Sequence, residues 1–389
     1  MENKREFGNV WAEINLDNLA YNIRSIREIV NPGTRIMAVL KANAYGFGAV
    51  EIARFLRGQA IDYFAVANLK EAAELRRAGI DTDILILGYT PDSRLASIID
   101  LGLTQTIYSL SQARILSDLA GERSSQARIH IKLDTGMARI GFRRMEDLEE
   151  IMEISRLDNI DLEGVYTHFA TGDMEDKSFA REQFRRYEKI VDKLEEKGLN
   201  ISIKHVSNSA DIMDLPDYDL DMVRAGIIMY GLYPSDEVRK ENLSLRPVMT
   251  LKTKISHIKV VEAGVGIGYG LSYTTDKTSK IGTIALGYAD GFSRGLSNLG
   301  EVGVGGQRAA IVGRICMDQT MIDLTGIEAE LEDEVVLFND GSNNYPTIEE
   351  MADKLGTINY EIVANLGRRV ERVYILGGRV LDCVDYVLD

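Results

Sequence analysis

The chain has 389 residues, which is enough for two domains, and its 45% hydrophobic and 27% charged residues are ordinary for a globular protein. Lys and Arg number 45 against 60 Asp and Glu, so the net charge is −15. An acidic surface repels nucleic-acid phosphates, so no nucleic-acid partner is expected. Two cysteines cannot build a disulfide framework, which favours a reducing cytoplasm, and four scattered histidines give no metal-binding pattern.

The first residues, 1–6, are charged and are not followed by an apolar segment, which argues against a signal peptide. No apolar run approaches the ~18 residues that a membrane-spanning helix needs. We therefore expect a cytoplasmic protein without membrane association.

Residues 1–243 alternate short apolar runs with amphipathic stretches. Eight runs that are apolar on both faces, separated by helices, favour a (β/α)₈ TIM-like barrel over an open doubly wound sheet. The helices include 71–78 and 175–197, each followed by glycine, and an early helix at 17–30 with Asp17 as its N-cap. The predicted strands are 36–42, 63–67, 84–87, 104–108, 128–133, 162–168, 201–206 and 222–225.

Residues 244–389 have a different pattern, with partial alternation of apolar and polar residues and frequent glycine turns. This pattern predicts a mostly β domain with one helix, 348–355, opened by Thr347. The polar segment 236–241 is the expected junction. The predicted strands are 248–261, 280–286, 309–312, 320–324 and 334–338.

Lys41 stands at the end of the first predicted barrel strand, where barrel enzymes place their chemistry. A lysine that closes an apolar strand is costly unless it is paired, neutral or covalently used. Burial lowers the pKa of a lysine and makes its amine a nucleophile for carbonyl groups. The alternative is a lysine whose charged end simply reaches solvent at the barrel mouth.

The segment 41–48, Lys-Ala-Asn-Ala-Tyr-Gly-Phe-Gly, resembles the lysine motif of the alanine racemases, with Phe47 where that family usually has histidine. The family is of the barrel type that binds pyridoxal 5'-phosphate (PLP). The resemblance implies an isomerase that interconverts L-alanine and D-alanine and supplies D-alanine for the peptidoglycan of the cell wall. It continues in the family's order through segments 134–141, 167–170, 207–209, 223–227, 268–270, 287–291 and 313–318.

The resemblance also assigns roles around the cofactor. It implies that Lys41 holds PLP as an imine, that Arg224 contacts the pyridine nitrogen and that His168 lies near Arg224. Because an arginine stays cationic, the ring nitrogen would remain unprotonated, which disfavours transamination. Arg139 would contact the cofactor's phenolic oxygen and the substrate carboxylate. The implied phosphate-binding residues are Tyr45, Asn208, Ser209, Gly226 and Ile227.

Racemisation needs a proton carrier on each face of Cα, and the resemblance implies Lys41 and Tyr269. Tyr269 would reach the cofactor of the other subunit, as would Met317 near the substrate carboxylate, which implies a homodimer with shared active sites. In many relatives the lysine at the position of Lys132 is carbamylated and holds the arginine seven residues on. An unmodified lysine is the alternative. The residues that match the substrate access channel are Asp173, Tyr288, Arg294, Arg314 and Arg368.

Arg368 stands where many alanine racemases have a tyrosine that narrows this channel. A racemase of serine or of basic amino acids is therefore the nearest alternative, and a PLP-dependent amino acid decarboxylase is a more distant one. A protein that only carries PLP is a further alternative, but it would consist of the barrel alone, and the predicted second domain argues against it. Without the resemblance, Lys41 would also fit a cofactor-free aldolase that forms a Schiff base.

Overall fold

The computed structural model describes residues 7–388 and divides them into two compact units. The barrel unit contains residues 20–44 and 48–245. The β-rich unit contains residues 246–388 together with residues 7–19 and Tyr45–Phe47. Each unit is therefore assembled from segments that are not continuous in the sequence.

The barrel unit contains the eight parallel strands that the sequence predicts. They are hydrogen-bonded in the order β8-β7-β6-β5-β4-β3-β2-β9. Between β8 and β9, the backbone N–H of Arg224 donates to the carbonyl of Ser207 at 3.0 Å, so the barrel is nearly closed. The strands are β2 (Arg35–Val39), β3 (Tyr63–Val66), β4 (Ile84–Ile86), β5 (Thr104–Ile107), β6 (Ala127–Lys132), β7 (Ile160–Tyr166), β8 (Ile203–His205) and β9 (Met222–Ala225).

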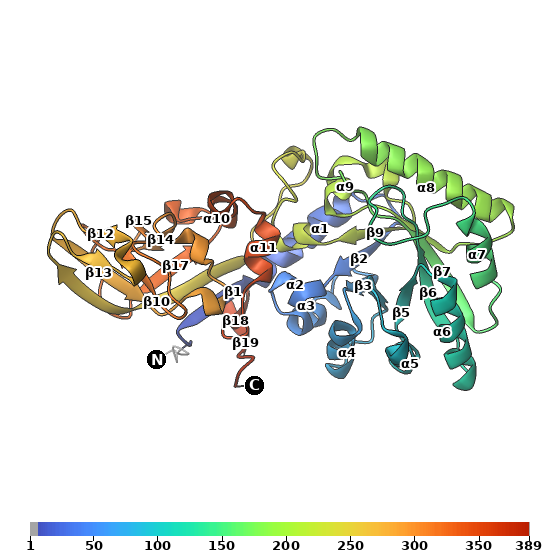
Figure 1. Cartoon of the computed structure of the whole chain (residues 1–389), viewed down its shortest axis with the longest axis horizontal. Helices are drawn as coiled ribbons and strands as arrows, with labels where there is room; N and C mark the ends of the chain where they lie inside the picture. Colours follow the sequence, from blue (N-terminus) through green and yellow to red (C-terminus); the bar gives the residue numbers. More distant parts are fainter. Residues whose placement is uncertain (1–6, 389) are drawn as a thin grey trace. The chain divides into compact units, whose positions relative to one another are not determined.

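Helices lie outside the barrel strands, as Figure 1 shows. The strands β3, β4 and β5 are buried at every position, as expected for strands packed between a barrel interior and surrounding helices. The α-helices of this unit are α3 (Ala49–Leu56), α4 (Leu69–Arg77), α5 (Ala96–Asp100), α6 (Leu110–Glu122), α7 (Asp147–Ile154), α8 (Ser178–Glu196) and α9 (Ser209–Asp214).

The early helix, α1 (Leu16–Ile29), begins one residue before the predicted N-cap. Asp17 is therefore not the cap. Asn15 takes that role, because its side-chain oxygen accepts a hydrogen bond from the backbone N–H of Asn18 at 2.9 Å. Asp17 lies in the first turn and accepts a hydrogen bond from the backbone N–H of Gly377 at 2.7 Å.

The β-rich unit contains a sheet of nine strands, which confirms a mostly β second domain. Its path is β15-β14-β17-β10-β1-β18-β19, and β13 joins β10 to β16. Strand β1 lies between β10 and β18 and was not predicted from the sequence. The strands are β1 (Val10–Asn15), β10 (Met249–Val261), β13 (Ser279–Ile284), β14 (Glu301–Val304), β15 (Gln307–Ala310), β16 (Thr320–Asp323), β17 (Glu334–Phe338), β18 (Glu371–Leu376) and β19 (Arg379–Val384).

Among its described residues, the β-rich unit contains two complete α-helices, where the sequence predicted one. The predicted helix is α10 (Ile348–Leu355), and the hydroxyl of Thr347 caps it by accepting from the backbone N–H of Glu350 at 3.2 Å. The second is α11 (Asn359–Ala364). A separate two-stranded ribbon, β11 (Gly266–Ile267) with β12 (Tyr273–Thr274), flanks the turn that carries Tyr269.

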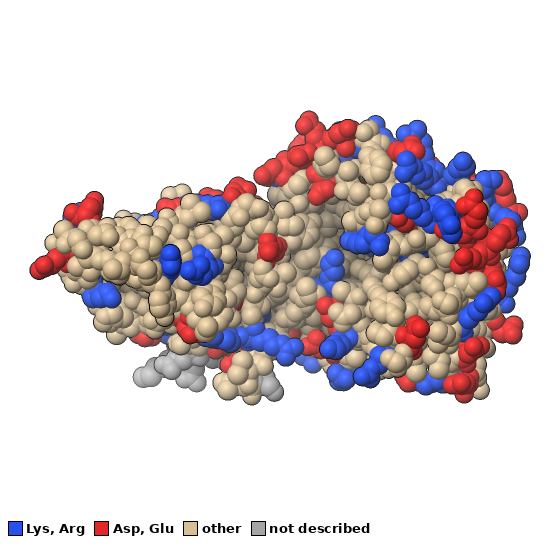
Figure 2. Space-filling view, in the orientation of Figure 1, with Lys and Arg blue, Asp and Glu red and all other residues tan. Residues whose placement is uncertain are grey.

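On the face shown in Figure 2, acidic and basic side chains are interspersed over the barrel unit. Among the described residues, no helix combines the length and the apolar character needed to cross a bilayer.

Candidate active site

Lys41 begins a tight left-handed turn, α2 (Lys41–Tyr45), immediately after β2. The prediction that the first strand continues to Ala42 is therefore wrong. Ala42, Asn43 and Ala44 have φ values of 54°, 54° and 52°, a conformation that costs L-residues roughly 1–2 kcal/mol each. Such a turn persists only where its surroundings hold it.

Hydrogen bonds hold this turn in place. The backbone N–H of Ala42 donates to the carboxylate of Glu71 at 2.8 Å. The side-chain oxygen of Asn43 accepts from the backbone N–H of Ala49 at 2.8 Å. The strained backbone therefore keeps Lys41 at the carboxyl end of β2, where the resemblance requires it.

Lys41 is half-buried, and its pKa is lowered from the usual lysine value by burial and then by the positive charges of Arg139 and Arg224, with Glu71 opposing them. A lower pKa increases the fraction of neutral amine, which is the form that attacks carbonyls.

Arg224 is a buried cation near Lys41. Its Nη1 donates to Nδ1 of His205 at 3.0 Å, and its Nη2 lies 3.1 Å from Nδ1 of His168. Nη2 also donates to the carbonyls of Thr167 and Val206 at 3.0 and 2.8 Å. Burial, followed by the charge of Arg224, lowers the pKa of His168 and of His205 well below the usual value. Both imidazoles are therefore neutral, and Arg224 is held entirely by neutral acceptors.

A polar cradle forms at the carboxyl ends of β8 and β9. Asn208 caps α9, since its side chain accepts from the backbone N–H of Ala210 at 2.8 Å, and the carboxylate of Asp211 accepts from the backbone N–H of Asn208 at 3.0 Å. The hydroxyl of Ser209 accepts from the backbone N–H of Gly226 at 2.9 Å. The hydroxyl hydrogen of Ser209 is therefore directed to a different acceptor, while Ile227 opens a short 3₁₀ turn.

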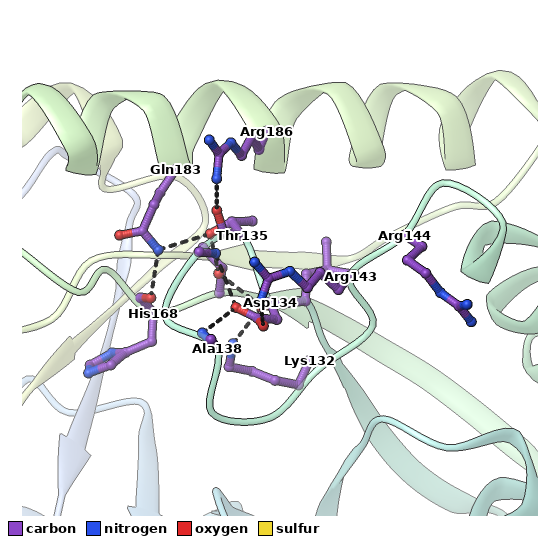
Figure 3. A network of polar contacts seen from close by, with 12 residues as sticks. Lys132, Asp134, Thr135, Ala138, Arg143, Arg144, His168, Gln183 and Arg186 are labelled. Carbon is purple, nitrogen blue, oxygen red and sulfur yellow. Dashed lines mark hydrogen bonds and ion pairs between the residues drawn. The ribbon is translucent and has the colours of Figure 1, made fainter.

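Lys132 ends β6 and is only 3% exposed. Burial, followed by the charge of Arg224, lowers its pKa to about 7. Asp134, two residues on, accepts backbone hydrogen bonds from Gly136 and Ala138 at 3.0 and 2.9 Å and so organises the loop that carries Arg139. Figure 3 shows this network, with Lys132 beside Asp134.

Gln183 on α8 links two of these loops. Its amide donates to the hydroxyl of Thr135 and to the carbonyl of His168, both at 3.3 Å (Figure 3). The hydroxyl of Thr135 in turn lies 2.8 Å from that of Thr167. The loops after β6 and β7 are therefore joined.

The barrel unit brings most of the predicted site residues to the carboxyl ends of its strands. These are Lys41, Lys132, Arg139, His168, Asn208, Ser209, Arg224, Gly226 and Ile227, and exposed Asp173 lies on the loop after β7. The β-rich unit carries the remaining ones, Tyr45, Tyr269, Tyr288, Arg294, Arg314, Met317 and Arg368.

Within the β-rich unit, the predicted residues lie on loops that pack against one another. The backbone N–H groups of Tyr288 and Ala289 donate to the carbonyls of Cys316 and Met317 at 3.1 and 3.0 Å. The guanidinium of Arg314 lies so close to Gly270 that a Cβ there would meet Nη1 at 3.0 Å. Tyr269 is 70% exposed and Met317 is 53% exposed in the single chain, and Arg294 and Arg368 are also exposed.

Tyr45 has a different environment from these exposed residues. It is buried, with its ring centroid 6.0 Å from that of Tyr360, and burial raises its pKa.

Sequence reasoning did not assign His205, Glu71 or Gln183 to the site. His205 lies inside a predicted strand, where a lone histidine among apolar residues gives little signal. Glu71 and Gln183 lie on helices and act through contacts that only the fold creates.

One end of the barrel carries a lysine with a lowered pKa, a buried arginine, and a group of polar residues after β8 and β9 that suits an anion. A β-rich unit is the second part of the molecule. This defines a two-domain barrel enzyme whose site faces the carboxyl ends of the strands. Residues 14–234 match the family profile "Alanine racemase, N-terminal domain", and residues 248–374 match "Alanine racemase, C-terminal domain". The chain belongs to the alanine racemase family.

Individual relatives agree across nearly the whole chain. The alanine racemase of Desulforamulus reducens is 48% identical over 368 residues, which cover 94% of this chain and 99% of that protein. The structure of alanine racemase from Clostridium difficile 630 matches with a TM-score of 0.95 and 48% identity, over 99% of this chain and 100% of that one. The Bacillus anthracis alanine racemase structure with bound L-Ala-P matches with a TM-score of 0.94 and 37% identity, over 98% and 99%.

Proposed function

We propose that this chain, as an isomerase of the alanine racemase family, racemises alanine with PLP held at the carboxyl ends of the barrel strands. The observation that carries the proposal is the convergence of Lys41, with its lowered pKa, and buried Arg224 on one end of the barrel. Membership of the alanine racemase family supports the same reaction.

The residues present fit the chemistry of this cofactor. Arg224 is a buried cation with no carboxylate in ion-pair distance among the described residues, so an electron-rich ligand atom would offset the cost of burying its charge. Its hydrogen bonds to His205 and His168 use Nη1 and Nη2, and Nε carries a further N–H. The Ser209 hydroxyl and the N–H groups at the start of a 3₁₀ turn suit a phosphate.

When bound, PLP supplies a carbonyl that condenses with amines and a conjugated ring that makes the proton on Cα acidic. Lys41 would hold the cofactor through its amine and would carry the proton on one face of Cα. Arg224 would stay cationic beside the cofactor ring and would not give its proton to the ring nitrogen, which favours return of the proton to Cα. His168, neutral and in contact with Arg224, keeps the guanidinium in place.

Tyr269 carries the proton on the opposite face, and in this proposal it does so in the site of a second copy of the chain. The high exposure of Tyr269 and Met317 in the single chain supports this, because two apolar side chains on neighbouring loops are left for a partner to cover. The protein is accordingly a homodimer with two shared sites.

Lys132 forms a carbamate in this proposal. Its neutral amine attacks CO₂, a C–N bond forms, one C=O electron pair becomes a carboxylate and the ammonium proton leaves to water. The resulting anion would oppose the cation of Arg139, whose charge already acts on Lys132. Arg139 would then be held for the substrate carboxylate.

The cellular role that we propose is the supply of D-alanine for peptidoglycan in the cytoplasm. The channel residues Asp173, Tyr288, Arg294, Arg314 and Arg368 would set which side chains enter. A PLP-dependent decarboxylase remains a weaker alternative. Such an enzyme would need a protonated ring nitrogen to withdraw electrons from the substrate, and buried Arg224 would leave that nitrogen unprotonated.

The test is a spectrum of the purified protein with PLP, followed by racemisation assays on L-alanine, L-serine and L-lysine. We expect an imine absorbance band that is lost in Lys41→Ala, and turnover of L-alanine above that of the other two. Preferred turnover of L-serine or L-lysine would show that Arg368 has changed the specificity. CO₂ release without racemisation would refute the proposal in favour of a decarboxylase.

A further inference from the structure

A continuous chain of hydrogen bonds runs through the interior of the barrel from Arg224 to Glu163. Nη1 of Arg224 lies 3.0 Å from Nδ1 of His205, and Nε2 of His205 lies 2.9 Å from Nδ1 of His130. Nε2 of His130 lies 3.1 Å from the carboxylate oxygen Oε2 of Glu163. Both histidines are fully buried, whereas the Glu163 side chain is 19% exposed.

The groups at the two ends determine which atom donates in each hydrogen bond between Arg224 and Glu163. The guanidinium of Arg224 can only donate, so Nδ1 of His205 must accept and its proton sits on Nε2. That Nε2–H donates to Nδ1 of His130, which places the His130 proton on Nε2 as well. The Nε2–H of His130 donates to Glu163, which is ionised and can only accept. Two neutral imidazoles therefore connect a cation to a carboxylate with one tautomer at each step.

The backbone of β7 directs the carboxylate of Glu163 toward His130. The register of β6 and β7 shifts between Ile129 and His130, which pair with Leu162 and Gly164, so Glu163 is the extra residue of a β-bulge. A bulge redirects a side chain that regular alternation would send to the other face. At the next residue, a Cβ on Gly164 would lie 2.8–2.9 Å from three atoms of the His130 ring, so only glycine leaves room for that ring.

The surrounding charges favour the same state. Burial lowers the pKa of His130 and of His205. At His130 the hydrogen bond to Glu163 and its negative charge oppose this effect, but the positive charges of Arg128 and Arg224 add to burial and the pKa is lowered overall. At His205 the charges of Arg224 and Lys132 act in the same direction as burial. Burial works to raise the pKa of Glu163, but hydrogen bonds from His130 and Tyr63 and the charge of Arg128 lower it overall. Tyr63 donates to the same oxygen, Oε2, at 3.0 Å.

Further groups face the carboxylate end of the chain. The hydroxyl of Thr104 lies 2.5 Å from that of Tyr63, and Arg128 also pairs with Asp83 at 2.6 Å. The carboxylate is therefore held by Tyr63 of β3 as well as by His130, and Arg128 acts on it through its charge.

We propose that Glu163 is a positioning residue that acts through His130 and His205 to hold the Arg224 guanidinium in one orientation. Without an acceptor at Glu163, only Arg224 would fix the two tautomers. An Nδ1–H form of His130 would then compete, because it avoids a buried N–H without a partner, but it would require an Nδ1–H on His205 that faces Arg224 in place of a lone pair. This inference rests on the proposed function for the importance of Arg224, but the hydrogen-bond chain itself is a property of the protein without cofactor.

The experiment is nitrogen NMR of histidine-labelled, cofactor-free protein, in which four histidines give a spectrum that can be assigned by substitution. For the wild-type protein we expect His130 and His205 as neutral Nε2–H tautomers at neutral pH. Glu163→Gln keeps a carbonyl acceptor and should retain both tautomers. Glu163→Met removes the acceptor and should shift both histidines toward Nδ1–H. Tyr63→Phe removes the other contact of the same oxygen and is the matched control, with unchanged tautomers.

A purely structural Glu163 would make Glu163→Met less stable without changing the tautomer of His205, which Glu163 does not touch. That result would overturn the proposal, and so would a charged imidazole or an Nδ1–H tautomer in the wild-type protein, even if a variant folds poorly.

In the holoenzyme we expect kcat to fall about tenfold in Glu163→Met and to stay close to wild type in Glu163→Gln, as the loss of a hydrogen bond to a charged group implies. Equal kcat in both variants would count against the proposal. The NMR result does not depend on racemase activity, so failure of this inference is distinguishable from failure of the proposed function.

Discussion

Replacing Lys132 with methionine should abolish a large pH dependence of stability. Folding lowers the pKa of Lys132 from 10.5 to about 7, and at about 1.4 kcal/mol per pH unit this interval corresponds to about 5 kcal/mol. Between these two values the unfolded chain binds more protons than the folded one, so the contribution of Lys132 makes the protein more stable as pH rises. Below pH 7 the ammonium is buried in the folded state, and the full cost of burying it is present.

The assay is urea unfolding of cofactor-free wild-type and Lys132→Met protein in CO₂-free buffers at several pH values. The histidines whose pKa is lowered by the charge of Lys132, His168 and His205, are already neutral above pH 7. In that range the pH dependence of the difference between the two unfolding free energies therefore reports Lys132. We expect this difference to shift in favour of the wild-type protein by about 3 kcal/mol from pH 7 to pH 9.5. A difference that is independent of pH would refute the lowered pKa.

Bicarbonate provides a second arm of the same experiment. If the neutral amine binds CO₂ as a carbamate in the folded state, bicarbonate should stabilise the wild-type protein and leave Lys132→Met unchanged. Equal responses in the two proteins would contradict the carbamate.

Three further substitutions test other parts of the molecule. Tyr269→Phe should keep PLP absorbance but slow deuterium exchange from solvent into one alanine enantiomer far more than into the other, and equal slowing would argue against bases on opposite faces. Ser209→Ala should weaken PLP binding in a fluorescence titration, because it removes a hydroxyl from the cradle, and unchanged affinity would exclude Ser209 from phosphate binding. Gly46→Ala should lower the melting temperature more than Gly198→Ala does. Both glycines have φ near +90°, but only the Cβ at Gly46 would meet a backbone carbonyl oxygen, at 2.1 Å, and equal losses would show that backbone strain alone decides.

Several features of this protein follow from the sequence because they depend on short-range patterns. Each of the eight barrel strands is a short apolar run next to a helix, so periodicity within a few residues predicts both. The motif that begins at Lys41 could likewise be found in the sequence, because it consists of particular residue types within one short segment. The predicted domain boundary after residue 243 stays a prediction. The β-rich unit also contains residues 7–19 and Tyr45–Phe47, which precede that boundary in the sequence.

The tertiary structure decided features that depend on residues far apart in the chain. Strand β1 is a single short apolar run, and only its pairing with β10 more than 230 residues later makes it a central strand. The left-handed turn after Lys41 runs against the preference of its alanines and depends on Glu71 from another helix.

The chain from Glu163 to Arg224 combines strands β6, β7, β8 and β9 through a bulge that no local pattern marks. Local propensities specify the elements of this protein. The environment of each buried charge is specified only when the barrel closes and brings those elements together.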